Sequence, residues 1–242
     1  KVLNYLNAKG EYDPNDPLGF TPSPAHRLDR NTSGIVIFGK NLPTLQQLLE
    51  LFRDKQHIRK TYIALLVGQT PASGTIDLPL VKDSNIGQVK VGRIEKGAKT
   101  AITKYKAIKK YPNYTLVEAQ LITGRTHQLR AHFQAIRHPI VGDAKYGDFK
   151  VNKVFEEKIG FKNQFLHAHT FEFLDLDGRL EYMSNKKFEA PLPKAKLKVL
   201  EYISSHPKSP DSMAKSSFIF RFLMKNESKL QGTVYVGGST RN

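Results

Sequence analysis

The feature that most constrains this chain is the junction between a polar segment, His26–Gly34 (HRLDRNTSG), and the apolar run Ile35–Phe38 that follows it directly. Residues that are apolar at consecutive positions of a strand are apolar on both faces, which is typical of a strand inside a sheet. The polar segment must then lie at the mouth of that sheet. It places the carboxylate of Asp29 between the guanidinium groups of Arg27 and Arg30.

Asp29 is the first candidate for a chemical role. Neighbouring positive charge favours the ionised form of a carboxylate, and an ionised carboxylate can act as a nucleophile. The alternative is structural, since an Asp beside two Arg residues can simply anchor a loop through salt bridges and backbone hydrogen bonds. This segment alone does not separate the two interpretations, and the rest of the chain has to decide.

Composition points to a basic, soluble protein. The 242 residues suit one large domain or two small ones, and 38 Lys and Arg against 22 Asp and Glu give a formal net charge of +16. Basic residues spread along a chain indicate a surface that meets a polyanion. The absence of cysteine excludes disulfides and thiolate chemistry and fits a reducing cytoplasm. No stretch approaches the roughly 20 apolar residues that cross a bilayer, and no signal peptide is visible. We therefore expect a cytoplasmic protein without a membrane partner.

Hydrophobic periodicity predicts an α+β sheet domain with mostly antiparallel strands. The expected strands are 35–38, 61–67, 100–109, 115–123, 164–174 and 180–188, and the expected helices are 43–54, 126–137 and 194–204. We expect extended loop up to residue 25, turns around a short strand at 68–79, and a loop or hairpin at 83–99. The compact domain should span 1–205, and 206–242 should form a flexible basic tail.

Two more segments carry candidate site residues. Tyr62 lies in the strand Arg59–Gly68, where it is either a core residue or an aromatic surface for a base, worth ~1–3 kcal/mol per stacked base. Arg125 follows Gly124 at a strand-to-helix junction, in TGRTHQLRAH, and an arginine held there can bind a carboxylate bidentately. The loop His138–Gly147 is either a structural turn or part of the same site.

The histidines do not predict a metal site. His127 and His132 are five apart, which separates them by roughly 140° around a helix. His167 and His169 can share one face of a strand, but no third ligand has a suitable spacing. A metal-dependent nuclease is a third hypothesis for the function, but the sequence lacks the carboxylate cluster that such sites require.

Four segments in register resemble the RluA-type pseudouridine synthases: HRLDRNTSG, RKTYIALLVG, TGRTHQLRAH and HPIVGDAKYG. The resemblance covers roughly residues 19–193, with no departure at the core positions. It implies isomerisation of uridine to pseudouridine in structured RNA, without cofactor or metal. We expect ribosomal RNA, rather than transfer RNA, as the substrate. The resemblance also implies a mixed, mostly antiparallel central sheet, flanked by helices and crossed by an RNA cleft.

Carried over by position, Asp29 resembles the catalytic aspartate of the family, Arg125 the arginine that pairs with it, and Tyr62 the active-site tyrosine that contacts the base. Arg27 resembles the arginine that enters the RNA stack where the uridine flips out. The remaining basic residues of these motifs are expected to contact phosphates or to support the site: His26, Lys60 and Arg130.

Several points stay open at this level. Asp29 can act as a nucleophile or as the base that removes a sugar proton, and Tyr62 or a water can take the proton from carbon 5. A non-catalytic RNA-binding module is the competing function, in which Asp29 is dispensable. We expect a monomer. The chain begins at Lys1, which leaves room for an upstream RNA-binding domain. If such a domain is missing, we expect weaker RNA binding than in the longer chain, with the active site intact.

Overall fold

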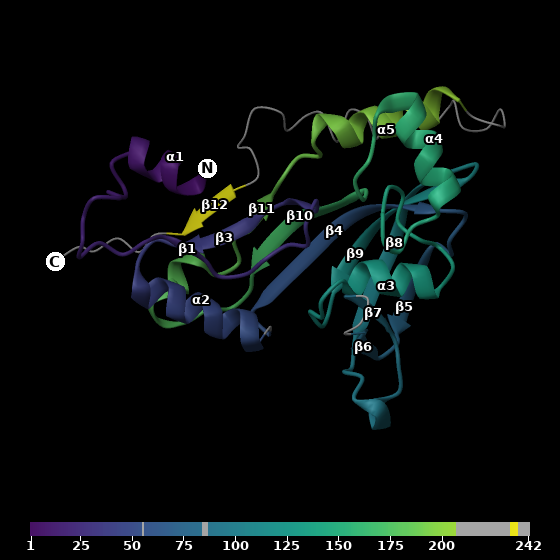
Figure 1. Ribbon diagram of the computed structural model, residues 1–242. Coiled ribbons are helices and arrows are strands. Elements are labelled where there is room, and N and C mark those ends of the chain that lie inside the picture. The colour runs from purple at the N-terminus through teal and green to yellow at the C-terminus, as the bar shows by residue number, and fades with distance from the viewer. Residues whose placement is uncertain (55, 84–86, 207–232, 237–242) are drawn as a thin grey trace.

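The computed structural model describes residues 1–54, 56–83, 87–206 and 233–236. Its main sheet contains β2 (Ser33–Gly34), β4 (Ile58–Val67), β5 (Ser73–Asp77), β8 (Ile102–Tyr111), β9 (Tyr114–Leu121), β10 (Leu166–Phe173) and β11 (Lys187–Glu189). The strand order is β11-β10-β4-β9-β8-β5, and β2 pairs with β10 beside this path (Figure 1). Among the described strands of this sheet, the β2–β10 pairing is the only parallel one. The expected α+β class with a mixed, mostly antiparallel sheet is confirmed.

The apolar run 35–38 forms a strand, but not in the main sheet. It contributes β3 (Val36–Gly39), which lies between β1 (Ser23–Pro24) and β12 (Thr233–Val236) in a separate three-stranded sheet. The reason lies on β10, where β2 pairs with His167 and Ala168 while β11 pairs from Thr170 onward. Because β11 occupies that edge, the chain after β2 cannot continue along β10 and turns into the smaller sheet.

The helices are α1 (Val2–Ala8), α2 (Leu42–Asp54), α3 (Gln128–Ala135), α4 (Phe149–Ile159) and α5 (Lys194–Ser205). Helices α2 and α5 match the prediction closely, whereas α3 begins two residues later than the expected Thr126 cap. Helices α1 and α4 were not predicted. Asp148 caps α4 by accepting hydrogen bonds from Lys150 N and Val151 N, and Leu6 buries one face of α1. In the described part of the chain, no helix is both long and apolar enough to span a membrane.

Two other predicted segments have a definite outcome. In the region expected to be a loop or hairpin at 83–99, β7 (Gln88–Val91) pairs antiparallel with β6 (Leu80–Asp83), and a single 3-10 turn, Ile94–Lys96, follows. The strand expected at 180–188 is mostly a 3-10 helix, Gly178–Met183, and only β11 at its end is extended. Leu180 and Met183 are both buried at a spacing of three, which fits the period of that helix.

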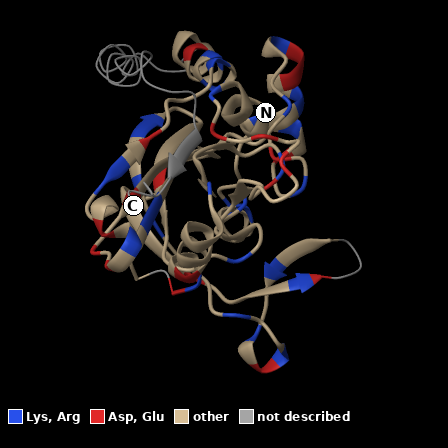
Figure 2. Cartoon of the chain, turned by 90° about the vertical axis from the view of Figure 1, so that its left-hand side faces the viewer, with Lys and Arg blue, Asp and Glu red and all other residues tan. Residues whose placement is uncertain are grey.

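The predicted basic tail lies largely outside the described residues. Residues 207–232 and 237–242 fall there, and between them β12 pairs in parallel with β3. Figure 2 shows that Lys and Arg residues are spread over several elements, including the strands β6 and β7 that project from the body.

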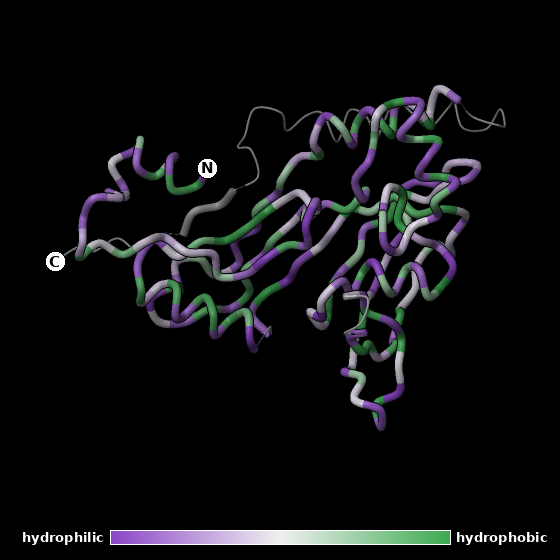
Figure 3. Tube along the Cα trace, in the orientation of Figure 1, coloured by the Kyte–Doolittle hydropathy of each residue, from purple (hydrophilic) through white to green (hydrophobic). Residues whose placement is uncertain are grey.

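Two hydrophobic cores position the functional loop. The larger core lies among β4, β8, β9, β10, α3, α4 and α5, and the smaller one joins β3 and α2 to Phe171 and Phe173. Figure 3 shows hydrophobic residues gathered where the strands cross the middle of the molecule. Ala25 and Ile35 belong to the smaller core, while Leu28 packs against the larger one. The segment 26–34 therefore crosses from one core to the other, and Asp29 lies at that crossing.

Candidate active site

A pocket of about 530 Å³ lies beside Asp29. It is lined by segments that are distant in sequence: the loop after His26, the start of β4, Lys82 of β6, Leu166 of β10, and the turn that leads into α3. Asp29, Tyr62 and Arg125, the three residues predicted to be catalytic, all line it. The tertiary structure therefore brings the candidate residues together.

The loop that carries Asp29 is held by backbone hydrogen bonds. Thr32 N donates to the carbonyl of Asp29 at 3.0 Å, which closes a turn through Asn31, whose φ is +68°. The buried amide of Gln164 donates to the carbonyl oxygen of Arg30 at 2.6 Å. The loop is thus fixed to the polypeptide just before β10, and the carboxylate of Asp29 projects from a defined backbone.

Sheet register places Tyr62 next to this loop. Ala168 of β10 pairs with Gly34 of β2 on one side and with Tyr62 of β4 on the other. Gly34 has φ +118°, and a Cβ atom there would lie 2.2 Å from the carbonyl oxygen of Ala168. Only glycine allows the backbone of the loop to approach β10 this closely. The distance between Asp29 and Tyr62 is therefore set by one intervening strand.

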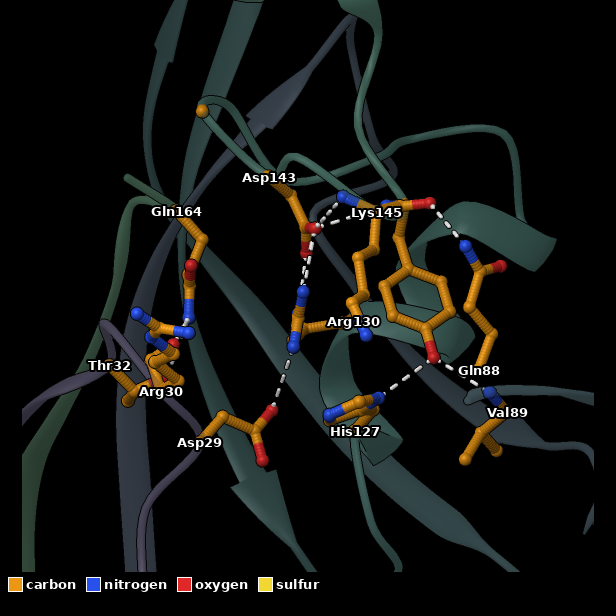
Figure 4. Close-up of polar contacts among 12 residues, drawn as sticks. Asp29, Arg30, Thr32, Gln88, Val89, His127, Arg130, Asp143, Lys145 and Gln164 are labelled. Carbon is orange, nitrogen blue, oxygen red and sulfur yellow. Dashed lines mark hydrogen bonds and ion pairs between the residues drawn. The ribbon is translucent and has the colours of Figure 1, made fainter. Parts of the chain in front are cut away.

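The carboxylate of Asp29 faces a buried arginine on α3. Nη1 of Arg130 lies 3.4 Å from Oδ2 of Asp29. The same guanidinium binds Asp143 bidentately, with Nε–Oδ2 at 2.7 Å and Nη2–Oδ1 at 2.8 Å. Figure 4 shows the two carboxylates on opposite sides of Arg130. Burial alone lowers the pKa of Arg130, but the hydrogen bonds and charge of Asp143, followed by Asp29, raise it above its ordinary value. Arg130 is therefore a fixed positive charge.

The predicted pairing of Arg125 with Asp29 is wrong, because Arg130 occupies that role. Arg125 is exposed in the turn before α3, and its Nε donates to the carbonyl of Thr100 at 2.9 Å. The inward-facing side of α3 carries Arg130 instead, whose side chain is 7% exposed. Sequence reasoning chose the arginine next to the glycine turn, whereas the helical phase of α3 selects the later one. Arg125 still lines the pocket at its rim.

His26 was expected either to contact phosphates or to support the site, and its contacts are those of a supporting residue. Its ring stacks on Phe52 at 4.5 Å between centroids, and its Nε2 accepts a hydrogen bond from Ile37 N at 3.1 Å. Burial, and then the charge of Lys60, lower the pKa of His26 to about 4. A neutral imidazole that is engaged in this way supports the backbone of β3 and has no charge to offer a phosphate.

The other predicted RNA-binding residues lie at the pocket. Arg27 is exposed and lines it together with Asp29, in agreement with their spacing of two. Lys60 lines it too, with Nζ 5.1 Å from the centroid of Phe52. Tyr62 is 7% exposed, and burial, followed by the charge of Asp29, raises its pKa well above the ordinary value. The Tyr62 phenol therefore keeps its proton around neutral pH.

Comparison with known proteins assigns the chain to a family. Residues 3–135, more than half of the chain, match the family model of RNA pseudouridylate synthases. The chain belongs to this family. Its relatives include the ribosomal large subunit pseudouridine synthase C of Haemophilus ducreyi, which is 39% identical over 61% of this chain and 46% of its own length. The tRNA pseudouridine synthase C of Salmonella typhimurium is 36% identical over 65% of this chain and 64% of its own. The chain thus spans about half to two thirds of the length of these relatives.

Solved structures agree with the pseudouridylate synthase assignment. Human RNA pseudouridylate synthase domain containing 4 superposes with a TM-score of 0.62 and 25% identity, over 84% of this chain and 82% of that one. A second human protein, RNA pseudouridylate synthase domain containing 1, has a TM-score of 0.54 at 21% identity over 78% of this chain and 83% of its own, which supports the fold.

Three residues to which the sequence assigns no catalytic role belong to this site or support it. His127 lines the pocket, Asp143 binds Arg130, and Tyr146 binds His127. The sequence suggests His127 only as a possible metal ligand, and the loop that holds Asp143 and Tyr146 is either a structural turn or part of the site. Within the described residues, no group of three or more ligating side chains is arranged to hold a metal ion. The available signal was the motif THQLR itself, in which Arg130 follows His127 by three residues. His127 lines the pocket just before α3, and Arg130 on α3 contacts Asp29.

Proposed function

We propose that this chain isomerises specific uridines to pseudouridine in structured RNA, with ribosomal RNA ahead of transfer RNA as substrate. The observation that carries the proposal is the carboxylate of Asp29, which lies beside the buried cation of Arg130 in a pocket that Tyr62 also lines. The relatives include a ribosomal large subunit pseudouridine synthase and a tRNA pseudouridine synthase, one for each of the two RNA classes. They support RNA as the partner of this chain.

The chemistry requires a carboxylate at the sugar. The bond between N1 of uracil and C1′ of ribose breaks, a new bond forms between C5 and C1′, C5 loses a proton and N1 gains one. In one route Asp29 adds to C1′ while the base turns, and in the other it removes the proton from C2′. Both routes need the charged carboxylate within reach of the sugar. Uridine and pseudouridine are isomers, so the overall reaction uses no oxidant and no group donor.

Arg130 is proposed to keep Asp29 charged and oriented. Its own position does not depend on Asp29, because Asp143 holds the guanidinium through two short hydrogen bonds. Asp29 is still partly exposed, at 24%, and its contact with Arg130 is long for a hydrogen bond. The carboxylate can therefore turn toward a bound nucleoside without disrupting the buried Arg130–Asp143 pair.

Tyr62 is proposed to support the uracil ring rather than to remove its C5 proton. A base must lose its own proton first, and burial keeps the phenol of Tyr62 protonated. A neutral tyrosine can still stack against the base, a contact worth ~1–3 kcal/mol. This leaves a water molecule as the acceptor of the proton from C5.

The rim of the pocket suits an extruded nucleotide. Extraction of a base from a stack costs a few kcal/mol, and a side chain that fills the gap reduces this cost. Arg27 is exposed beside Asp29 and is proposed to fill that gap. Lys60, Lys82 and Arg125 line the same pocket and offer positive charge to the flanking phosphates. We also propose that the chain works as a monomer in the cytoplasm, whose reducing conditions suit a composition without cysteine.

Incubation with total RNA, followed by mapping of new pseudouridines, tests the activity and identifies the substrate together. Wild-type protein should convert specific uridines, and Asp29→Asn, which preserves shape and removes charge, should abolish conversion. Asp54→Asn changes an exposed aspartate outside the pocket and serves as the matched control. Pseudouridine formation by the Asp29 variant at the wild-type rate would overturn the assignment. RNA binding without any conversion by the wild type would favour the non-catalytic module.

A further inference from the structure

The imidazole of His127 is held on the wall of the pocket by a buried tyrosine. Nδ1 of His127 lies 2.9 Å from the hydroxyl oxygen of Tyr146, and the two rings meet edge to face at 5.6 Å between centroids. Tyr146 is 1% exposed, and its ring also packs against the guanidinium of Arg130. The orientation of His127 is therefore determined by the same buried cluster that fixes Arg130.

The hydrogen bonds of Tyr146 determine which nitrogen of His127 carries the proton. Val89 N of β7 donates to the Tyr146 hydroxyl oxygen at 2.7 Å. The hydroxyl hydrogen is then free to be donated, and within the described residues the acceptor in contact with it is Nδ1 of His127. A neutral imidazole that accepts at Nδ1 carries its hydrogen on Nε2.

That N–H group is directed away from Tyr146 and toward the pocket. His127 lines the pocket together with Asp29, and Figure 4 shows both on the side of Arg130 that faces away from Asp143. Burial is the largest cause that lowers the pKa of His127. The negative charge of Asp29 raises this pKa, the positive charges of Arg130 and Lys145 lower it further, and Asp143 raises it slightly, so that the pKa lies below its ordinary value. The ring is thus a neutral hydrogen-bond donor at neutral pH. The backbone of His127 is also left-handed, with φ +52°, just before α3.

We propose that Nε2–H of His127 binds a carbonyl oxygen of the flipped uracil and stabilises the negative charge that develops on it as the base leaves the sugar. This inference rests on the proposed function. When the N1–C1′ bond breaks, its electron pair stays with the uracil, and the charge spreads onto O2 and O4. A positioned neutral imidazole stabilises such oxygens without transferring its proton.

The geometry of the reaction fits a donor that stays fixed. Rotation of uracil about the axis through N3 and C6 exchanges N1 with C5, and the same rotation exchanges O2 with O4. A single N–H group therefore meets one carbonyl before the rotation and the other after it. It stabilises the base throughout, and it favours uracil over cytosine, which presents an amino group in place of O4.

The test compares His127→Asn with His127→Gln on a short RNA containing the uridine mapped in total RNA. The amide of Asn lies near the position of Nδ1 and that of Gln near the position of Nε2, so only Gln keeps a donor in the pocket. Asn also tolerates the left-handed backbone well. We expect the saturating rate to fall about 10²-fold in His127→Asn, with little change in KM, and to be partly restored in His127→Gln.

The decisive measurement uses the same RNA with 2-thiouridine or 4-thiouridine at the target position, because sulfur accepts hydrogen bonds weakly. The wild type should lose about three- to tenfold in rate with each sulfur, and His127→Asn should lose less. Equal losses in the two proteins would overturn the proposal. Tyr146→Phe removes the hydroxyl that fixes the tautomer of His127, so it should also reduce the rate loss caused by each sulfur substitution. This variant replaces His127→Asn in the test if His127→Asn does not fold. A wild type that converts no uridine at all would refute the proposed function first, and this inference with it.

Discussion

Arg130 is bound bidentately by Asp143, at 2.7 and 2.8 Å, and only weakly by Asp29, at 3.4 Å. The side chain of Asp143 is completely buried. It also accepts hydrogen bonds from the backbone N–H groups of Lys145 and Tyr146. The positioning of the cation is therefore separate from the carboxylate that it serves. Asp29 is left able to respond to substrate.

The different roles of Arg130 and Arg125 can be tested by matched Lys substitutions. Lysine keeps the charge but cannot form the bidentate contact with Asp143. Arg130→Lys should reduce the rate at saturating RNA by about 10²-fold, because the charge beside Asp29 is no longer fixed. Arg125→Lys should keep that rate within a few-fold, since its Nε binds only the Thr100 carbonyl. Single-turnover kinetics on the mapped RNA measure both, and equal losses would contradict the assignment.

Gly34 should be indispensable for stability. Gly34→Ala combines a positive φ with a Cβ only 2.2 Å from the carbonyl oxygen of Ala168, so the loop must move away from β10. The free energy of unfolding should fall by more than about 1 kcal/mol. Gly10→Ala is the matched control, because φ is +68° there but no atom lies within 4 Å. Urea unfolding of both variants measures this difference. A similar loss of unfolding free energy in the two variants would show that the close approach of Gly34 to β10 is unimportant.

Stability should decline in mild acid because two histidines are held neutral. Burial, in each case the largest cause, lowers the pKa of His26 and of His167 to about 4. Between pH 6.5 and 4 the unfolded chain binds protons at these positions and the folded chain does not, so the free energy of unfolding falls as pH falls through this range. Urea titrations at several pH values measure the slope. His26→Phe should make it shallower, and an unchanged slope would contradict this account.

Lys196 should give a second pH effect, on the alkaline side. Its Nζ donates to Ser33 Oγ at 2.8 Å from a site that is 5% exposed, and burial lowers its pKa to about 8. Between pH 8 and 10.5 the unfolded chain keeps this proton while the folded chain has lost it, so stability should rise with pH in that range. Lys196→Met should remove the rise. Thermal unfolding at pH 7.5, 9 and 10 tests this, and the same rise in the variant would exclude Lys196 as its source.

Local patterns were sufficient for much of the fold. The periodicity of 43–54 and 194–204 predicted α2 and α5, and the strand pair 100–123 was predicted across its turn, because neighbouring residues specify these elements. The short helices α1 and α4 were missed. Each depends on one buried or capping residue, Leu6 or Asp148, and not on a long apolar stripe.

The amino-acid sequence supplied the reactive groups: a carboxylate at Asp29, an aromatic ring at Tyr62 and several arginines within recognisable motifs. The tertiary structure alone decided which of them meet. It selected Arg130 over Arg125, made His26 a support for β3, and placed His127 on the pocket wall, where Tyr146 holds its ring. The physical reason is that a contact depends on helical phase, on sheet register and on which strand edges are already occupied. These are set by packing between segments that lie far apart in the chain.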